Sequence, residues 1–322
     1  TGTFQLTKSV VGDGKALGYQ PGSQFTFAVD CTDGYESTVD LADGQSWTPD
    51  RAIASGSSCT ITETGKPDPL SPAFGWDDVE FGIGTSRVNG SITIRIPETA
   101  TPIQVNAVNP ITPRFGSLEL TKQVTGQTAG LVPGTTFDVN VSCGPGDLFT
   151  VTLTEGEPRT LTGIPVGVSC TVAELPPDPA GLVDASYGWG PATYDPGATV
   201  TIAQEGQQVE VAIVNPIVRV GAPVRVVKSL TGGQGVIDPA RTYPITWSCT
   251  YGGQQVAGGT LDAVVDPTGV VVDQDVPLTA QCTATEGDVG VPSDDPAYRW
   301  LAPTVTGTRS EERRVGKECT IQ

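Results

Sequence analysis

A series of landmark residues occurs three times along this chain, at intervals of about 110 residues. The first series is Lys8, Cys31, Cys59, Glu63, Trp76 and Asn109, the second is Lys122, Cys143, Cys170, Glu174, Trp189 and Asn215, and the third is Lys228, Cys249, Cys282, Glu286 and Trp300. The third series has no closing Asn. A repeat of this length matches a whole small domain and is too long for one solenoid unit. The chain is therefore predicted to be a tandem array of one module.

The landmarks divide the 322 residues into three modules and a tail. The predicted bounds are 1–111, 115–217 and 222–308, and the third module is expected to be truncated before its last strands. The run from Arg309 to Cys319 resembles a back-translated sequencing adapter, so 309–322 is predicted to be a non-native tail. A natural charged tail is the alternative. Because Thr1 lies inside a strand-like segment with no leader, we expect the chain to be an internal fragment.

The composition and the hydrophobic pattern indicate an all-β fold. The chain has 40 Gly and 27 Pro and only 17% charged residues, which suits short strands joined by many turns. In the second module, apolar and polar residues alternate over 118–124, 137–143, 149–153 and 209–215, and no segment has a helical period. About seven such strands are typical of an immunoglobulin-like β-sandwich. We therefore predict three tandem sandwiches of this class.

The net charge and the residue content argue against several classes of function. With a net charge of −18 and no basic patch, the chain is not expected to bind nucleic acid. The chain has no His, which removes the commonest zinc ligand and general base, so we expect no metal, no cofactor and no turnover of an external substrate. Aspartate-rich spots match no full calcium loop. No apolar stretch is long enough to span a membrane.

Six of the seven cysteines fall two to a module, 27 to 33 residues apart. One long-range pair per module favours a disulfide over a zinc site, because zinc sites use closely spaced pairs. The predicted disulfides are Cys31–Cys59, Cys143–Cys170 and Cys249–Cys282. Their alternation with apolar neighbours points the sulfurs inward, and we expect each pair to meet across the core. Disulfides imply an oxidising, extracytoplasmic location.

The same alternation places three polar landmarks of each complete module on the apolar face of their strands. These residues are Lys8, Glu63 and Asn109 in the first module, and Lys122, Glu174 and Asn215 in the second. Burial shifts lysine and glutamate toward their neutral forms, and a neutral amine is a nucleophile. The lysine is then able to attack the asparagine carboxamide, with the glutamate moving protons. The alternative is that the lysines snorkel, the glutamates end strands in water and the asparagines cap turns.

The order of Lys in the first strand, Glu in a late middle strand and Asn in the last strand resembles the Cna B-type domains of Gram-positive pilins and adhesins. The L-x-L-T-K opening of the second module, the paired cysteines and the closing V-N-P resemble related repeats of actinobacterial surface proteins. This resemblance implies Lys8–Asn109 and Lys122–Asn215 isopeptide bonds, with Glu63 and Glu174 as catalytic groups. The chain departs from the family pattern because no Ala-Pro-x-Gly-Tyr follows either glutamate.

The expected function is that of a structural stalk in an extracellular, wall-attached or pilus-like bacterial protein. Proline-rich connectors at 109–117 and 215–223 should make the array a stiff, monomeric rod. The alternative is an adhesin module that binds a host or matrix ligand, in which case exposed residues should differ between modules. The recurrent tryptophans are expected to be core residues, and a sugar-stacking surface is the other interpretation.

Overall fold

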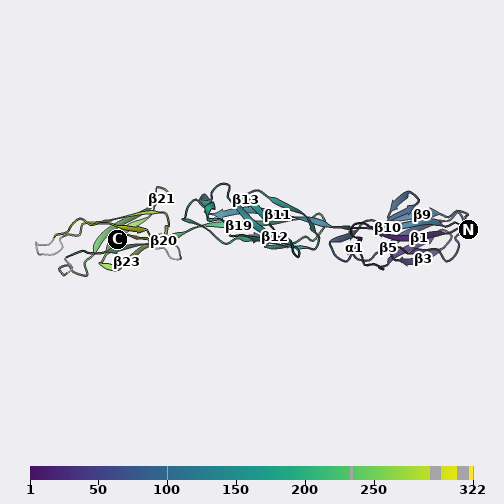
Figure 1. Ribbon diagram of the computed structural model, residues 1–322, viewed down its shortest axis with the longest axis horizontal. Helices are drawn as coiled ribbons and strands as arrows, with labels where there is room; N and C mark the ends of the chain where they lie inside the picture. Colours follow the sequence, from purple (N-terminus) through teal and green to yellow (C-terminus); the bar gives the residue numbers. More distant parts are fainter. Residues whose placement is uncertain (100, 233–234, 291–298, 310–318, 322) are drawn as a thin grey trace.

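The computed structural model of the protein describes residues 1–99, 101–232, 235–290, 299–309 and 319–321. Three β-rich modules lie end to end in an elongated molecule (Figure 1). In the described ranges, no helix is both long enough and apolar enough to cross a bilayer.

Module 1 is a sandwich of two sheets. The first sheet has the strand order β4-β1-β10-β7-β8, with β6 on β10, and the second has the order β3-β2-β5-β9. The elements are β1 (Phe4–Val11), the one-turn helix α1 (Lys15–Gly18), β2 (Phe25–Cys31), β3 (Glu36–Leu41), β4 (Ser46–Trp47), β5 (Ser58–Gly65), β6 (Phe74–Trp76), β7 (Glu80–Ile83), β8 (Ser86–Asn89), β9 (Ser91–Arg95) and β10 (Ile103–Pro113). The first and last strands, β1 and β10, are parallel neighbours.

Module 2 repeats this plan with sheets β14-β11-β19-β16, carrying β17 on β19, and β13-β12-β15-β18. Its elements are β11 (Phe115–Gly126), the 3₁₀ turn η1 (Thr128–Gly130), β12 (Thr136–Cys143), β13 (Leu148–Thr154), β14 (Arg159–Pro165), β15 (Ser169–Glu174), the 3₁₀ turn η2 (Pro179–Gly181), β16 (Tyr187–Trp189), β17 (Thr193–Asp195), β18 (Thr199–Thr201) and β19 (Gln208–Arg219). The strands predicted at 118–124, 137–143, 149–153 and 209–215 are all present, as β11, β12, β13 and β19. The all-β tandem fold is therefore confirmed.

Module 3 has sheets β23-β20-β26-β25 and β22-β21-β24. Its strands are β20 (Gly221–Lys228), β21 (Tyr243–Tyr251), β22 (Gln254–Ala263), β23 (Asp266–Pro277), β24 (Gln281–Glu286), β25 (Gly307–Arg309) and β26 (Cys319–Ile321). Strand β26 runs parallel to β20, in the place that β10 and β19 occupy in their modules. Part of the predicted tail therefore pairs within the module, whereas its residues 310–318 and 322 lie outside the described residues.

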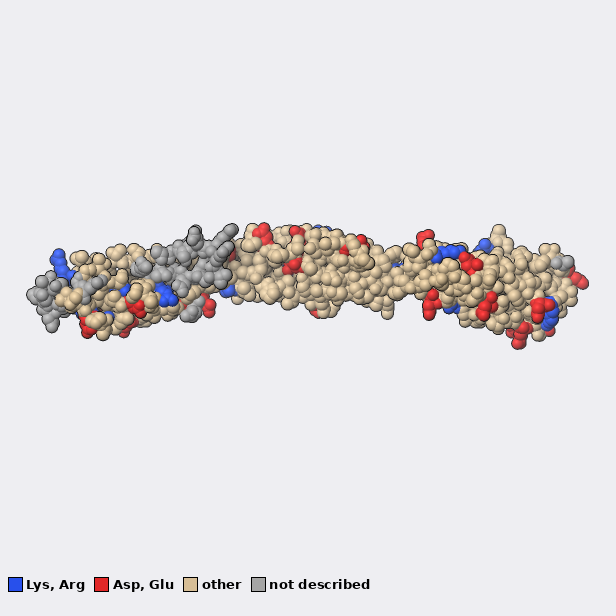
Figure 2. Space-filling model, turned by 60° about the horizontal axis from the view of Figure 1, so that its bottom comes forward, with Lys and Arg blue, Asp and Glu red and all other residues tan. Residues whose placement is uncertain are grey.

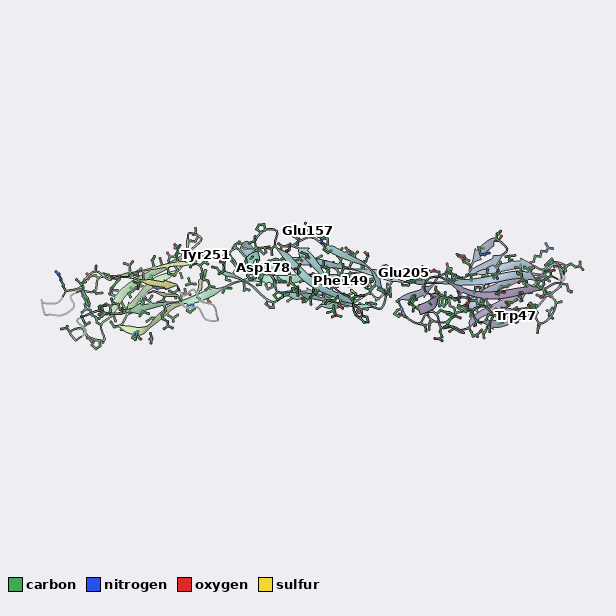
Figure 3. The ribbon with its side chains drawn as sticks, in the orientation of Figure 1. Trp47, Phe149, Glu157, Asp178, Glu205 and Tyr251 are labelled. Atoms are coloured by element: carbon green, nitrogen blue, oxygen red, sulfur yellow. A yellow bond between two sulfur atoms is a disulfide. The ribbon has the colours of Figure 1, made fainter. Side chains whose placement is uncertain are left out.

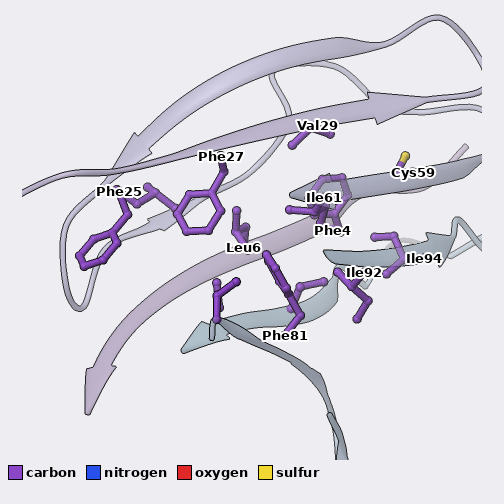
Figure 4. Packing of buried hydrophobic residues seen from close by; sticks show 14 of the residues in the cluster. Phe4, Leu6, Phe25, Phe27, Val29, Cys59, Ile61, Phe81, Ile92 and Ile94 are labelled. Atoms are coloured by element: carbon purple, nitrogen blue, oxygen red, sulfur yellow. The ribbon is translucent and has the colours of Figure 1, made fainter. Parts of the chain in front are cut away.

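The core of each complete module lies between its two sheets, because alternate residues of every long strand are apolar. In β1 the buried positions alternate strictly with partly exposed ones from Phe4 to Val10. Aromatic side chains fill much of module 1, where Phe27 and Phe81 meet edge to face with ring centroids 6.3 Å apart (Figure 4). Module 2 fills its main cluster mainly with Val, Leu and Ile.

Each predicted cysteine pair is a disulfide, but its place in the sandwich differs from our expectation. Cys31 and Cys59 stand directly opposite each other on β2 and β5, two neighbours in one sheet, with Cα atoms 4.0 Å apart. The pair therefore joins adjacent strands and does not bridge the two sheets. Sequence alternation tells which face a residue takes, but it does not tell which strand lies beside it.

The connectors between modules also differ from the sequence-based expectation. Strand β10 continues through Asn109 to Pro113, because β6 pairs with its end, and β11 begins at Phe115. Only Arg114 separates the two strands, and only Val220 separates β19 from β20. The predicted stiff connectors are thus mostly strand.

Candidate cross-linking sites in the module cores

The polar landmarks of module 1 meet inside its sandwich. Lys8 lies on β1 and Asn109 on the parallel neighbour β10, and the side chains of both are fully buried. Glu63 reaches them from β5 in the facing sheet, where it stands opposite Phe27. The alternation that buries Phe4 and Leu6 therefore buries the lysine as well.

In module 1 the glutamate is bonded to the asparagine. Asn109 Nδ2 donates to Glu63 Oε1 at 2.8 Å, while Lys8 Nζ donates to the Ser9 carbonyl at 2.6 Å. Burial lowers the pKa of the Lys8 amine to about 8, against the opposing attraction of Glu63. Burial also raises the pKa of Glu63, although the hydrogen bond from Asn109 opposes this shift. Both groups are thus displaced toward their neutral forms.

In module 2 the lysine is bonded to both partners. Lys122 Nζ donates to Asn215 Oδ1 at 2.5 Å and lies 2.8 Å from Glu174 Oε1. The side chains of Lys122 and Glu174 are 0% and 2% exposed. Burial lowers the pKa of Lys122, and the hydrogen bond and charge of Glu174 oppose that shift. The amine nitrogen therefore lies beside the carbonyl that it would attack.

Module 3 contains the lysine and the glutamate of the Lys–Glu–Asn group. Lys228 Nζ lies 2.9 Å from Glu286 Oε1, and both side chains are largely buried. The parallel register pairs Val226 with Ile321, as it pairs Leu6 with Val105 in module 1. The position equivalent to Asn109 follows four residues later and falls beyond Gln322.

An aromatic ring covers each lysine, which the sequence analysis did not anticipate. Lys8 Nζ is 3.9 Å from the ring centroid of Phe25, Lys122 Nζ is 4.3 Å from that of Phe137, and Lys228 Nζ is 4.6 Å from that of Tyr243. Each ring lies six residues before the first cysteine of its module, a spacing that was visible in the sequence. The rings exclude water and attract whatever positive charge the amine carries.

The recurrent tryptophans pack against these rings. Trp76 packs edge to face on Phe25 with centroids 5.2 Å apart, and Trp189 packs likewise on Phe137 at 5.5 Å. The Trp76 indole N–H donates to the carbonyl of Pro67 at 2.7 Å. A partly buried tryptophan with a satisfied N–H fits the predicted packing role.

The arrangement suits amide exchange between the lysine and the asparagine. The amine nitrogen would form a bond to the asparagine Cγ, and the Cγ–Nδ2 bond would break. A neutral glutamic acid would protonate the leaving nitrogen and take the proton that the amine loses, so ammonia leaves and one amide replaces another. Among the described residues, Asn215 Nδ2 and Asn109 Oδ1 are buried without a hydrogen-bond partner. The exchange would release Asn215 Nδ2 as ammonia and so remove the desolvation cost of that unsatisfied donor.

Comparison with known proteins identifies one family. The model described as "Domain of unknown function (DUF5979)" matches residues 4–112, 118–217 and 224–322. No curated protein matches the chain.

Several solved structures show a distant likeness. The major pilin protein (T-13) of Streptococcus pyogenes is 14% identical, with 67% of this chain and 97% of that chain covered and a TM-score of 0.30. The Bacillus anthracis TIE protein is 13% identical over 88% of this chain and 43% of that one, with a TM-score of 0.35. A Mobiluncus mulieris adhesin "containing intramolecular disulfide, isopeptide, and ester bond cross-links" is 17% identical over 62% and 87%, with a TM-score of 0.27.

Proposed function

Because the chain belongs to the DUF5979 family and carries that domain three times, we propose that it is a covalently cross-linked stalk of a bacterial cell-surface protein. The observation that carries this proposal is the buried Lys–Glu–Asn group of each complete module. Unpaired charges are rarely placed in a core, and here two modules place the same three polar side chains together. A bond from Lys8 to Asn109 and another from Lys122 to Asn215 would tie the first strand of each module to its last.

The junctions support a stiff stalk. At the first, Arg114 Nη2 lies 2.6 Å from Asp77 of module 1, and its Nη1 lies 2.7 Å from Glu205 of module 2. Figure 3 places Glu205 at the end of module 2 that faces module 1. One guanidinium therefore bonds to both modules, which restricts bending at a single-residue connection.

Aromatic stacking restricts the second junction. The Arg219 guanidinium lies 4.2 Å from the ring centroid of Tyr187 in module 2 and 4.7 Å from that of Tyr251 in module 3. The Tyr251 hydroxyl donates to Asp184 at 2.8 Å. Contacts of this kind favour one relative orientation of the modules. The three disulfides support an oxidising location outside the cytoplasm.

Intact mass of the full chain tests the cross-links. Each isopeptide bond releases one ammonia, so the non-reduced chain should weigh about 34 Da less than its sequence with three disulfides, or about 17 Da per bond. Glu63→Gln and Glu174→Gln keep the size of the side chain and remove its proton transfer, so each variant should retain about 17 Da. Tryptic fragments joining Lys8 to Asn109 and Lys122 to Asn215 would locate the bonds. A full-length mass with no ammonia missing would refute the cross-linked stalk.

A further inference from the structure

Module 2 contains a hollow of about 500 Å³ between β13 and β14. These two strands are edge strands, one in each sheet. The lining includes Cys143, Asp147, Leu148, Phe149, Leu161 and Ile164. A space of this size, lined by apolar side chains, threonines and one charged side chain, falls within the range of ligand sites.

Module 1 fills the equivalent space with its own side chains. Tyr35 follows Cys31 by four residues and is 6% exposed within the core, whereas the residue four positions after Cys143 is Asp147. Trp47, opposite Leu6 on β1, corresponds by register to Arg159, opposite Leu120 on β11, so module 2 lacks this aromatic ring as well. The neighbouring cysteines differ in exposure accordingly. Cys31 is 2% exposed, whereas Cys143 is only partly buried.

Module 1 also shows which groups this space accepts. The Arg51 guanidinium lies 4.9 Å from the ring centroid of Tyr35, and its Nη1 lies 3.3 Å from Asp33 Oδ2. The closed site thus combines an aromatic ring, a cation stacked on the ring and an adjacent carboxylate. Module 2 supplies the carboxylate, Asp147, and lacks the ring. The chain as a whole is strongly acidic, and acidic side chains outnumber basic ones on the face in Figure 2.

The strand beside the hollow is suited to pairing with another chain. Strand β13 reads Leu-Phe-Thr-Val-Thr-Leu-Thr, with no charge and no proline, and Leu148 is 70% exposed. The equivalent β3 of module 1 carries Glu36 and Asp40, which are charges of the kind that protect an edge. Figure 3 shows Phe149 on module 2, at the strand that borders the hollow. The hollow and the unprotected edge occur together in module 2.

We propose that the hollow of module 2 binds an extended segment of a partner polypeptide, which adds to the edge of β13. The segment inserts an aromatic side chain where Tyr35 stands in module 1, and a basic side chain two positions along the strand meets Asp147. Backbone hydrogen bonds to β13 provide the alignment, and the aromatic pocket provides the selectivity. Because this site uses neither Lys122 nor Asn215, the peptide-binding proposal does not depend on whether the cross-link forms.

A labelled peptide tests the proposal with the full chain. The probe is fluorescein-Thr-Val-Tyr-Val-Arg-Val-Thr-amide, in which Tyr and Arg share one face when the peptide is extended. Binding is measured by anisotropy against the wild-type chain and against Asp147→Tyr, which restores the module 1 side chain and fills the hollow. We expect Asp147→Tyr to weaken binding at least about tenfold. Glu157→Tyr makes the same exchange at an exposed turn of module 2 outside the lining and should bind like wild type.

Control peptides separate the two elements of recognition. Replacing the peptide Tyr with Ser should weaken binding at least about tenfold, and N-methylation of alternate amides should do the same by blocking strand addition. The proposal is overturned if the Ser peptide binds as well as the Tyr peptide, or if Asp147→Tyr binds like wild type. It is also overturned if N-methylated peptides or free p-cresol bind as tightly as the peptide, since the hollow would then take an isolated ring and not a strand.

Discussion

Modules 1 and 2 hold the same three polar residues in two different hydrogen-bonding arrangements. In module 1 the glutamate contacts the amide nitrogen that would leave, and the lysine is turned to a backbone carbonyl. In module 2 the lysine contacts the amide oxygen of the asparagine and the carboxylate together. The two sites thus show the two contacts that amide exchange needs, glutamate to leaving group and amine to carbonyl. The strands that carry the lysine and the asparagine have the same register in both modules, so the difference between the two arrangements does not come from strand pairing.

This difference also determines how much stability each module should lose when its Lys–Glu–Asn group is disrupted. In module 2 the lysine is the charge partner of a fully buried carboxylate, whereas the carboxylate of module 1 accepts a hydrogen bond from a neutral amide. Replacing the lysine should therefore change the free energy of unfolding by different amounts in the two modules. The difference between these two amounts measures how strongly the two sites differ.

The largest expected effect is that of Lys122→Met. Compared with an uncross-linked chain, in which Lys122 is still a cation, it leaves Glu174 buried without its partner and should lower the free energy of unfolding of module 2 by about 3–5 kcal/mol. The matched variant Lys8→Met should cost module 1 less, about 1–3 kcal/mol, because Asn109 still bonds to Glu63. Guanidinium unfolding followed by tryptophan fluorescence measures both losses. Adding Glu174→Gln to Lys122→Met should recover part of the stability, and equal losses in the two modules would contradict the comparison.

The disulfides offer a second contrast. Each closes a loop of 28 or 27 residues in modules 1 and 2, so the chain-entropy model gives either one about 3 kcal/mol of stabilisation. The two disulfides differ in their access to solvent, because Cys143 borders the hollow while Cys31 is buried with Tyr35 in the core. A phosphine reductant should therefore open Cys143–Cys170 on the order of tenfold faster than Cys31–Cys59.

Timed alkylation and peptide mass spectrometry measure the two reduction rates. Asp147→Tyr should slow reduction in module 2 toward the rate in module 1, and Glu157→Tyr should leave it unchanged. Equal rates in the wild-type chain would show that the hollow does not admit the reductant.

The smallest expected effect is a pH dependence confined to uncross-linked chains. Folding lowers the pKa of Lys8 from 10.5 to about 8, so between these values the unfolded chain binds more protons than the folded one. The stability of module 1 should then rise with pH across that window, by about 1–3 kcal/mol, because the buried amine is neutral above it. Thermal unfolding from pH 7.5 to 10.5 measures the slope. Lys8→Met should abolish it, and a chain with a Lys8–Asn109 bond should show none, since no amine remains to titrate.

Alternation in the sequence predicted much of this fold because a strand exposes one face and buries the other. That rule placed Lys8, Lys122, Asn109 and Asn215 in the interior, where the structure buries them. It also marked the strands of module 2. Alternation carries no information on which strands are neighbours, so it missed the parallel pairing of β1 with β10. The placement of Cys31 beside Cys59 in one sheet was missed for the same reason.

Other features depended on comparing modules side by side. Phe25 and Phe137 looked like ordinary core residues, because nothing in a single strand shows that an amine lies over the ring. The junctions were expected to be stiff proline-rich connectors, and the sequence did not show that β10 runs through both Pro110 and Pro113. The hollow lies where Asp147 stands in place of Tyr35, and this exchange has no periodic signature. Only the structure shows that Tyr35 fills a space that Asp147 leaves open.

The parallel pairing of first and last strands decides how a pulling force would cross the molecule. Tension applied at the two ends of module 1 draws β1 and β10 in opposite directions along their shared ladder, from Phe4 opposite Ile103 to Val11 opposite Pro110. All of those hydrogen bonds resist in shear at once, and none is peeled off alone. The load then passes through Arg114 into β11, while β2 and β5 with their disulfide lie to one side of it. A Lys8–Asn109 bond would sit within that loaded ladder and would make the module inextensible.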